Sequence, residues 1–208
     1  MKPQIMLGKR ALQLVLCATV ASAALTAQTA YADVITVDFT GNPFSTVPFN
    51  LDGFYLNVVT GATGTSGSGT AGWDLNPYFT GSTTPPAGFR FFTPTGGGMV
   101  GAAGIVTPLV PGNMVGAGSA FITGVTNAST TGTNYFGFRF VNETTATTNY
   151  GYVVVAQSVN PPVAGAVQVL SYSYDNTGAA ITVVPEPSTW LMMLGGLAAV
   201  GLMRRRLS

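Results

Sequence analysis

The sequence contains no histidine, and its one cysteine, Cys17, lies near the N-terminus. The absence of histidine excludes a Ser-His-Asp triad, a Cys-His pair and the usual histidine-containing zinc sites. Residues 33–184 also contain no lysine and no cysteine. This stretch therefore cannot be stabilised by disulfides, and it has to fold through the burial of its side chains alone.

Charge is scarce as well, at 7% of the chain, and within residues 33–184 it is mostly negative. Two arginines, Arg90 and Arg139, stand against six carboxylates. These acidic residues are Asp33, Asp38, Asp52, Asp74, Glu143 and Asp175. A surface with so few cations has no basic stripe that could neutralise phosphates, so nucleic acid is not an expected partner.

The N-terminus has the three parts of a secretory signal. Three basic residues among the first ten precede an uncharged, mostly apolar run over residues 11–25. Ala30 and Ala32 then supply the small residues that signal peptidase recognises, which predicts cleavage before Asp33. The alternative, a first transmembrane helix, is less well supported because the run is short and ends at a cleavage site. We therefore expect residues 1–32 to be a signal peptide.

Residues 33–184 show the alternation of β-strands and no sustained helical period. About 150 residues suit one domain with a sizeable core. Short alternating or β-branched runs are separated by segments rich in Gly, Pro, Asn and Ser, which favour turns. The predicted strands fall within 33–39, 54–59, 88–92, 120–125, 135–141, 150–156, 167–174 and 179–183. The pattern predicts an all-β fold, a single antiparallel β-sandwich or jelly-roll-like domain over 33–184.

The clearest part of this pattern is a predicted hairpin around the polar loop 142–149. Phe136, Phe138 and Phe140 share one face of the first strand, and aromatic and β-branched residues alternate along the second. Packing of the three phenylalanines in the core is the expected role of such a stripe. The functional alternative is an aromatic platform that stacks on sugar rings.

With histidine, lysine and cysteine absent from residues 33–184, only carboxylates remain as catalytic candidates. A pair of them could hydrolyse a glycoside if they lay at the right separation. The candidates are Asp38, Asp52, Asp74, Glu143 and Asp175. None lies in a recognisable motif, and solvated carboxylates in loops or at strand ends are the commoner case. We therefore expect no enzyme activity, no cofactor and no metal.

The C-terminus combines a turn, an apolar segment and a basic cluster. Pro185 and Pro187 interrupt regular structure and display Glu186 between them. The 14 residues 190–203 form a predicted helix of roughly 21 Å, shorter than a hydrocarbon core of about 30 Å. Arg204, Arg205 and Arg206 follow and would act as a stop-transfer signal on the cytoplasmic side.

This order resembles the PEP-CTERM sorting signal of exosortase-dependent bacterial proteins, with Pro185-Glu186-Pro187 as the motif within residues 185–208. The resemblance implies export, transient anchoring in the inner membrane and processing by an exosortase-type protease or transpeptidase. In that family the product reaches the cell surface or the extracellular matrix of bacteria that make exopolysaccharide, which makes exopolysaccharide a candidate partner.

Three functions follow from these observations. The leading hypothesis is a non-catalytic structural protein of the surface or of the exopolysaccharide matrix of a biofilm. The second is a lectin-like carbohydrate-binding module whose exposed aromatics stack on sugar, with Trp73, Tyr78 and Tyr55 as the predicted contacts. The third is a glycosidase that uses only carboxylates.

Overall fold

The computed structural model describes residues 33–39, 42, 45–80, 88–128, 130–159 and 163–184. Contacts divide the chain into two compact units, Met1–Asp33 and Val34–Ser208, and every described strand belongs to the second. The strands are β1 (Val34–Asp38), β2 (Tyr55–Leu56), β3 (Thr63–Gly64), β4 (Asn76–Phe79), β5 (Phe89–Thr93), β6 (Gly98–Ala102), β7 (Ile105–Val106), β8 (Pro108–Leu109), β9 (Met114–Val115), β10 (Phe121–Ile122), β11 (Gly124–Asn127), β12 (Gly132–Asn142), β13 (Thr147–Gln157), β14 (Val167–Asp175) and β15 (Ile181–Thr182).

The part of the chain that the structure describes is all-β, and no α-helix occurs in it. Its residues accordingly include no helix with the length and apolar character needed to cross a membrane. The predicted signal peptide and the predicted helix over 190–203 both lie outside the described residues. The predicted cleavage before Asp33 would leave β1 intact, because that strand begins at the next residue.

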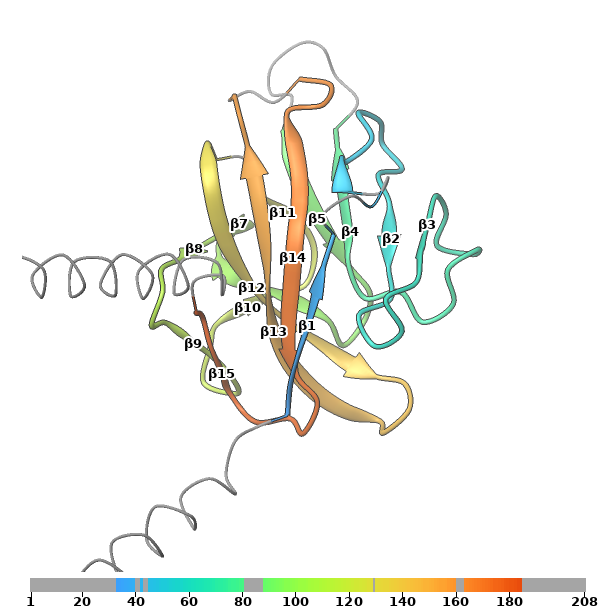
Figure 1. The fold of residues 1–208 in the computed structure, drawn as a ribbon. Helices are drawn as coiled ribbons and strands as arrows, with labels where there is room; N and C mark the ends of the chain where they lie inside the picture. The colour runs from blue at the N-terminus through green and yellow to red at the C-terminus, as the bar shows by residue number, and fades with distance from the viewer. Residues whose placement is uncertain are drawn as a thin grey trace, which may run out of the picture. The chain divides into compact units, whose positions relative to one another are not determined.

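Most strands belong to one large sheet with the order β1-β14-β13-β12-β6-β7-β11-β5-β4 (Figure 1). Its neighbours are antiparallel, except that β7 and β11 pair in parallel through Ile105 and Asn127. Two short ladders, β15 with β9 and β2 with β3, lie outside this path. The all-β prediction is thus confirmed, but the prediction of a purely antiparallel arrangement is corrected at one pair: the sheet is mixed.

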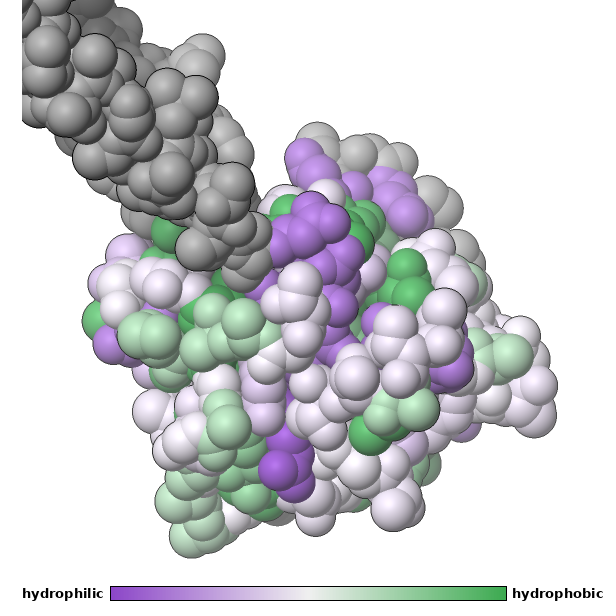
Figure 2. All heavy atoms as spheres, turned by 90° about the horizontal axis from the view of Figure 1, so that it is seen from below, coloured by the Kyte–Doolittle hydropathy of each residue, from purple (hydrophilic) through white to green (hydrophobic). Residues whose placement is uncertain are grey.

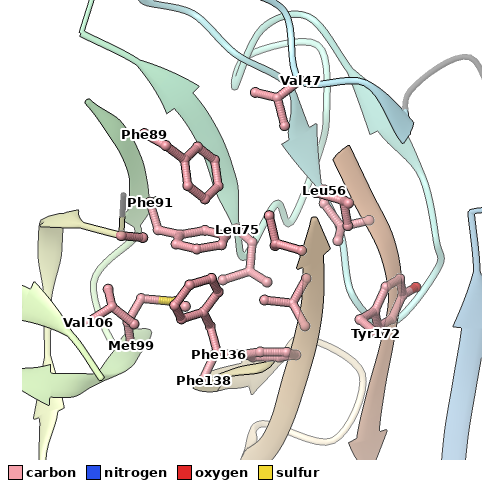
Figure 3. Close-up of a cluster of buried hydrophobic side chains, with 14 of the residues drawn as sticks. Val47, Leu56, Leu75, Phe89, Phe91, Met99, Val106, Phe136, Phe138 and Tyr172 are labelled. Carbon is pink, nitrogen blue, oxygen red and sulfur yellow. The ribbon is translucent and has the colours of Figure 1, made fainter. Parts of the chain in front are cut away.

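The sheet curls so that its two halves enclose the main core. β5 and β12 are separated by other strands in the sheet order, yet the rings of Phe91 and Phe136 meet with centroids 5.7 Å apart. Figure 3 shows residues of both halves, among them Leu75 and Met99, pointing into this common interior. A curled sheet buries one continuous apolar face without any helix to cover it, which explains the dense aromatic content of the short strands.

The predicted hairpin is confirmed as β12 and β13, paired in antiparallel register from Gly132–Gln157 to Asn142–Thr147. Phe136, Phe138 and Phe140 are almost fully buried in the main core, as predicted. The opposite side of these strands is covered by a second cluster that includes Val115 of β9 and Ile181 of β15. Because β13 is buried on both faces, its run Tyr-Val-Val-Val is almost continuously apolar.

The surface of this body carries few strongly polar residues. Figure 2 shows one face on which hydrophobic and hydrophilic residues form separate patches within a surface of near-neutral hydropathy. This agrees with a chain in which only 7% of residues are charged.

Candidate functional site

The outer side of β4, β5 and β11 displays aromatic residues that the core does not use. Along β5, Phe89 and Phe91 are fully buried, whereas Phe92 keeps 37% of its surface exposed. Arg90 is partly exposed on the same outer side as Phe92, since alternate residues of a strand share a face. The strand thus contributes two rings to the core and a ring and a guanidinium to the surface.

Strand pairing arranges these outer side chains in two cross-strand rows. Phe92 lies opposite Asn76 of β4 and opposite Val125 of β11. Two residues earlier in β5, Arg90 lies opposite Tyr78 of β4. Directly opposed side chains of antiparallel strands lie roughly 4.5–5.5 Å apart at Cβ, so each row forms a contiguous surface.

Tyr55 and Trp73 extend this surface at the edge of β4. Their rings meet edge to face with centroids 5.0 Å apart, and Trp73 also contacts Phe92 at 5.4 Å. Gly67 makes this approach possible, because a Cβ at that position would lie only 2.9 Å from Trp73 Nε1 and 3.0 Å from Tyr55. We call Tyr55, Trp73, Tyr78 and Phe92 the aromatic face.

Two neighbouring cavities open on the aromatic face and share Phe92. One, of about 210 Å³, is lined by Leu51, Tyr55, Asn76, Tyr78, Phe92 and Val125. The other, of about 490 Å³, is lined on its polar side by the threonines Thr93, Thr95 and Thr123. Apolar walls with a few polar groups are typical of sites that bind small organic ligands.

Two polar groups on this surface lack hydrogen-bond partners among the described residues. Asn76 is only 2% exposed; its Nδ2 donates to the Asp52 carbonyl at 2.9 Å, but its Oδ1 accepts no hydrogen bond. The Nε of Arg90 is buried and donates to no acceptor. Buried polar atoms in proteins are nearly always hydrogen-bonded, so these two atoms mark Asn76 and Arg90, which are diagonal neighbours across β4 and β5, as candidates for a further polar partner.

A separate cluster brings two of the candidate carboxylates close together. Asn57 Nδ2 donates to Glu143 Oε1 at 2.5 Å, and Asp74 Oδ2 accepts from the Val58 N–H at 2.8 Å. Burial raises the pKa of Asp74 from 3.8 to about 7; the hydrogen bond from Val58 opposes this rise and the charge of Glu143 adds to it. Asp74 is only 4% exposed, and neither carboxyl lines the two cavities of the aromatic face.

The other candidate carboxylates lie in other parts of the body. Asp175 is fully buried, and its Oδ1 accepts hydrogen bonds from Thr177 and from the Ala179 N–H, which fixes the turn after β14. Asp38 lies at the exposed end of β1, and Asp52 lies in an exposed loop. No group of three or more His, Cys, Asp or Glu side chains that could hold a metal occurs within the residues that the structure describes.

The structure brings the three predicted sugar contacts together and adds residues that the sequence did not single out. Tyr55 contacts Trp73 directly and lines one cavity with Tyr78. Phe92, Asn76 and Arg90 were missed, because their placement depends on strand register. One signal was available: an arginine between two phenylalanines marks the solvent side of β5, and alternation places Phe92 on the same side.

The sorting residues Pro185, Glu186 and Pro187, the arginines 204–206, and Ala30 and Ala32 lie outside the described residues; Asp33 is exposed just before β1. The last described strand, β15, pairs with β9, and in the two described residues after it the Val183 N–H donates to the Asn113 carbonyl at 2.8 Å.

A family model described as the PEP-CTERM protein-sorting motif matches residues 183–206. No curated protein and no solved structure matches the chain. The motif indicates a protein that is exported and sorted at the membrane as an exosortase substrate. The chain therefore contains a PEP-CTERM protein-sorting motif, as the resemblance of its C-terminus implied.

Proposed function

We propose that the β body is a non-catalytic, glycan-binding component of the cell surface or of the exopolysaccharide matrix. The observation that carries this proposal is the aromatic face, four aromatic side chains beside two cavities on the outer side of β4 and β5. An exosortase substrate works outside the cytoplasm, where polysaccharide is an abundant ligand.

The chemistry of the face suits a sugar ring. The ring C–H groups of a pyranose form an apolar surface that can lie against an aromatic side chain, while its hydroxyls need polar partners at the rim. Phe92 and Trp73 supply ring surface with centroids 5.4 Å apart, and threonines line the neighbouring cavity. Because Phe92 belongs to both cavities, the site would suit a chain of several sugars better than a single one.

The test is the retardation of the protein in native gels that contain exopolysaccharide from the host. We expect the wild-type protein to be retarded and Trp73→Ala to migrate freely, with Tyr78→Ala as a second variant in case Trp73→Ala folds poorly. Phe121→Ala is the matched control, because Phe121 packs in the second cluster and not on the aromatic face. Free migration of the wild-type protein, or equal retardation of Trp73→Ala, would contradict glycan binding.

The same samples test the absence of catalysis. Asp74, whose pKa is raised, and the nearby Glu143 are the two kinds of residue that make up a glycosidase pair. In such a pair one carboxyl is protonated near neutral pH. We expect no release of reducing sugar, because Asp74 is almost completely buried. Release of reducing sugar that is lost in Asp74→Asn would make this chain a glycosidase instead.

A further inference from the structure

We propose that Asn76 and Arg90 form the polar pair that selects a neutral polysaccharide on the aromatic face. This inference rests on the proposed glycan binding and names the class of glycan. Asn76 Oδ1 and Arg90 Nε are buried without a hydrogen-bond partner among the described residues; Asn76 lines the smaller cavity, and Arg90 lies opposite Tyr78 of the aromatic face.

Asn76 is held in place by its own hydrogen bond and by the strand around it. Its Nδ2 donates to the Asp52 carbonyl at 2.9 Å, which leaves Oδ1 as the free atom of a side chain that lines the smaller cavity. A carbonyl oxygen can only accept, so its ligand partner has to be a donor such as a hydroxyl. A carboxylate ligand would bring a second acceptor against it and would be disfavoured.

Arg90 supplies a hydrogen-bond donor two residues from Phe92, the residue that lies opposite Asn76. Its partly buried side chain lies opposite Tyr78, and its Nε has no acceptor among the described residues. A guanidinium can only donate, so it requires an acceptor from the ligand, which the oxygen of a sugar hydroxyl supplies. One sugar ring carries several hydroxyls, each of which can donate to Asn76 or accept from Arg90.

The spacing of the pair agrees with a ligand of this size. Asn76 and Arg90 are diagonal neighbours across β4 and β5, a relation that places Cβ atoms at most about 7–8 Å apart. Phe92 lies opposite Asn76 and Tyr78 lies opposite Arg90, so each polar group has an aromatic neighbour. The four side chains enclose a patch that combines stacking with hydroxyl recognition.

The charge of the body favours a neutral chain over an acidic one. Residues 33–184 carry six carboxylates and two arginines, so a polyanion would be repelled by the whole domain. A single arginine cannot offset that repulsion along a polymer with a charge on every sugar. We therefore assign the site to polysaccharides without carboxylate or sulfate groups.

The experiment measures binding of the full chain, recovered from host cells in detergent, to soluble probes. The neutral probes are a β-glucan and a galactomannan, and the acidic probe is polygalacturonate. We expect a neutral probe to bind more tightly than polygalacturonate. Arg90→Gln and Asn76→Ala should each weaken that binding by about tenfold or more, as expected for loss of a hydrogen bond to a buried group.

Arg139→Gln is a matched control for Arg90→Gln. Arg139 is the other arginine of the body; its Nε is likewise buried without an acceptor among the described residues, but its guanidinium lies 4.8 Å from the Phe121 ring, away from the aromatic face. The Arg139→Gln variant should bind the probes like the wild-type protein. Circular dichroism and melting temperature separate loss of binding from loss of folding.

The outcomes distinguish the two proposals. If no probe and no host polysaccharide binds, glycan binding itself fails. If the wild-type protein binds a neutral probe but Arg90→Gln and folded Asn76→Ala bind equally well, glycan binding stands and the assignment of this pair is overturned. Tighter binding of polygalacturonate, lost in Arg90→Gln, would overturn the neutral class and make Arg90 a carboxylate site.

Discussion

Asp74 and Tyr172 bind opposite sides of the same residue, Val58. The Val58 N–H donates to Asp74 Oδ2 at 2.8 Å, and the Tyr172 hydroxyl donates to the Val58 carbonyl at 3.1 Å. Burial, followed by the nearby Tyr174 and Asp74, raises the pKa of Tyr172 well above its ordinary value, so the hydroxyl keeps its proton. The segment after β2 is thus fixed to β14 by the hydroxyl of Tyr172, and to the residues just before β4 by the carboxyl of Asp74.

The first prediction concerns the pH dependence of stability. Burial raises the pKa of Asp74 to about 7 in the folded protein, whereas the unfolded chain has the ordinary value of 3.8. Between pH 3.8 and about pH 7, the carboxyl of Asp74 is therefore protonated in the folded protein and ionised in the unfolded chain. The contribution of Asp74 to the free energy of unfolding should be largest below pH 4 and fall as the pH rises to 7, by up to about 4 kcal/mol.

Urea denaturation from pH 4 to pH 8 measures this effect, with Asp74→Asn as the reference. The amide cannot ionise but keeps an oxygen that accepts from Val58, so the difference between the two proteins isolates the titration of Asp74 from that of other carboxyls. We expect the variant to gain stability relative to the wild-type protein as the pH rises. A difference that stays constant across this range would show that Asp74 titrates normally.

The second prediction concerns Gly151 in β13. A Cβ there would lie 2.5 Å from Phe138 Cζ and 2.6 Å from the Ser173 carbonyl oxygen, and Phe138 is fully buried. Gly151→Ala should therefore destabilise the fold by about 1–3 kcal/mol through overpacking. Gly118→Ala is the matched control, because nothing lies within 4 Å of its Cβ position, and it should change stability by less than about 0.5 kcal/mol. Equal unfolding temperatures for the two variants would contradict this packing.

Some strands could be predicted from the sequence and others could not. The alternation of Phe136, Phe138 and Phe140 identified β12 and its buried face, because a period of two with large apolar residues has one common explanation. β4 and β6 were missed: Pro77 suppresses a strand prediction, and β6 contains Gly98 and Gly101. In the structure, close packing accounts for Gly101, whose Cβ would lie 2.2 Å from the Ile105 carbonyl oxygen.

The site was predictable in its residue types but not in its arrangement. Trp73, Tyr78 and Tyr55 could be selected as aromatic residues expected at the surface, without knowledge of their neighbours. Asn76 and Arg90 join them only through the register of β4 with β5, which no local pattern specifies. Likewise, Asp74 and Glu143 lie far apart in the sequence, and no spacing rule indicates that they bind the adjacent residues Val58 and Asn57.

The third prediction locates the end of the folded body. Ile181 and Val183 are 3% and 1% exposed in the second cluster, and the Val183 carbonyl accepts from the Gly112 N–H at 2.8 Å. A chain that ends at Val184 should keep the full unfolding free energy. One that ends at Ala180 should lose about 3–6 kcal/mol, since burial of each side chain contributes about 1.5–3 kcal/mol. Calorimetry of the two truncated proteins checks this, and equal melting temperatures would place the boundary before β15.

The fourth prediction concerns Glu186, which lies in the part of the chain matched by the sorting motif. If an exosortase recognises Pro185-Glu186-Pro187, Glu186→Ala should stay in the membrane fraction at full length, while the β body keeps its melting temperature. Intact mass of the membrane and extracellular pools is the measurement. Asp52→Ala, which removes an exposed carboxylate from the body, is the control and should mature normally.

The expected wild-type product begins at Asp33 and ends between Pro185 and Thr189, because the predicted signal cleavage and the sorting motif bound it there. Such a product keeps β15 and Val183, so cleavage should release the body without unfolding it. If Glu186→Ala instead leaves the membrane at the wild-type rate, recognition does not depend on that carboxylate. If every wild-type molecule keeps its tail, the β body acts as a membrane-anchored domain, and its aromatic face would hold polysaccharide at the membrane surface rather than in the matrix.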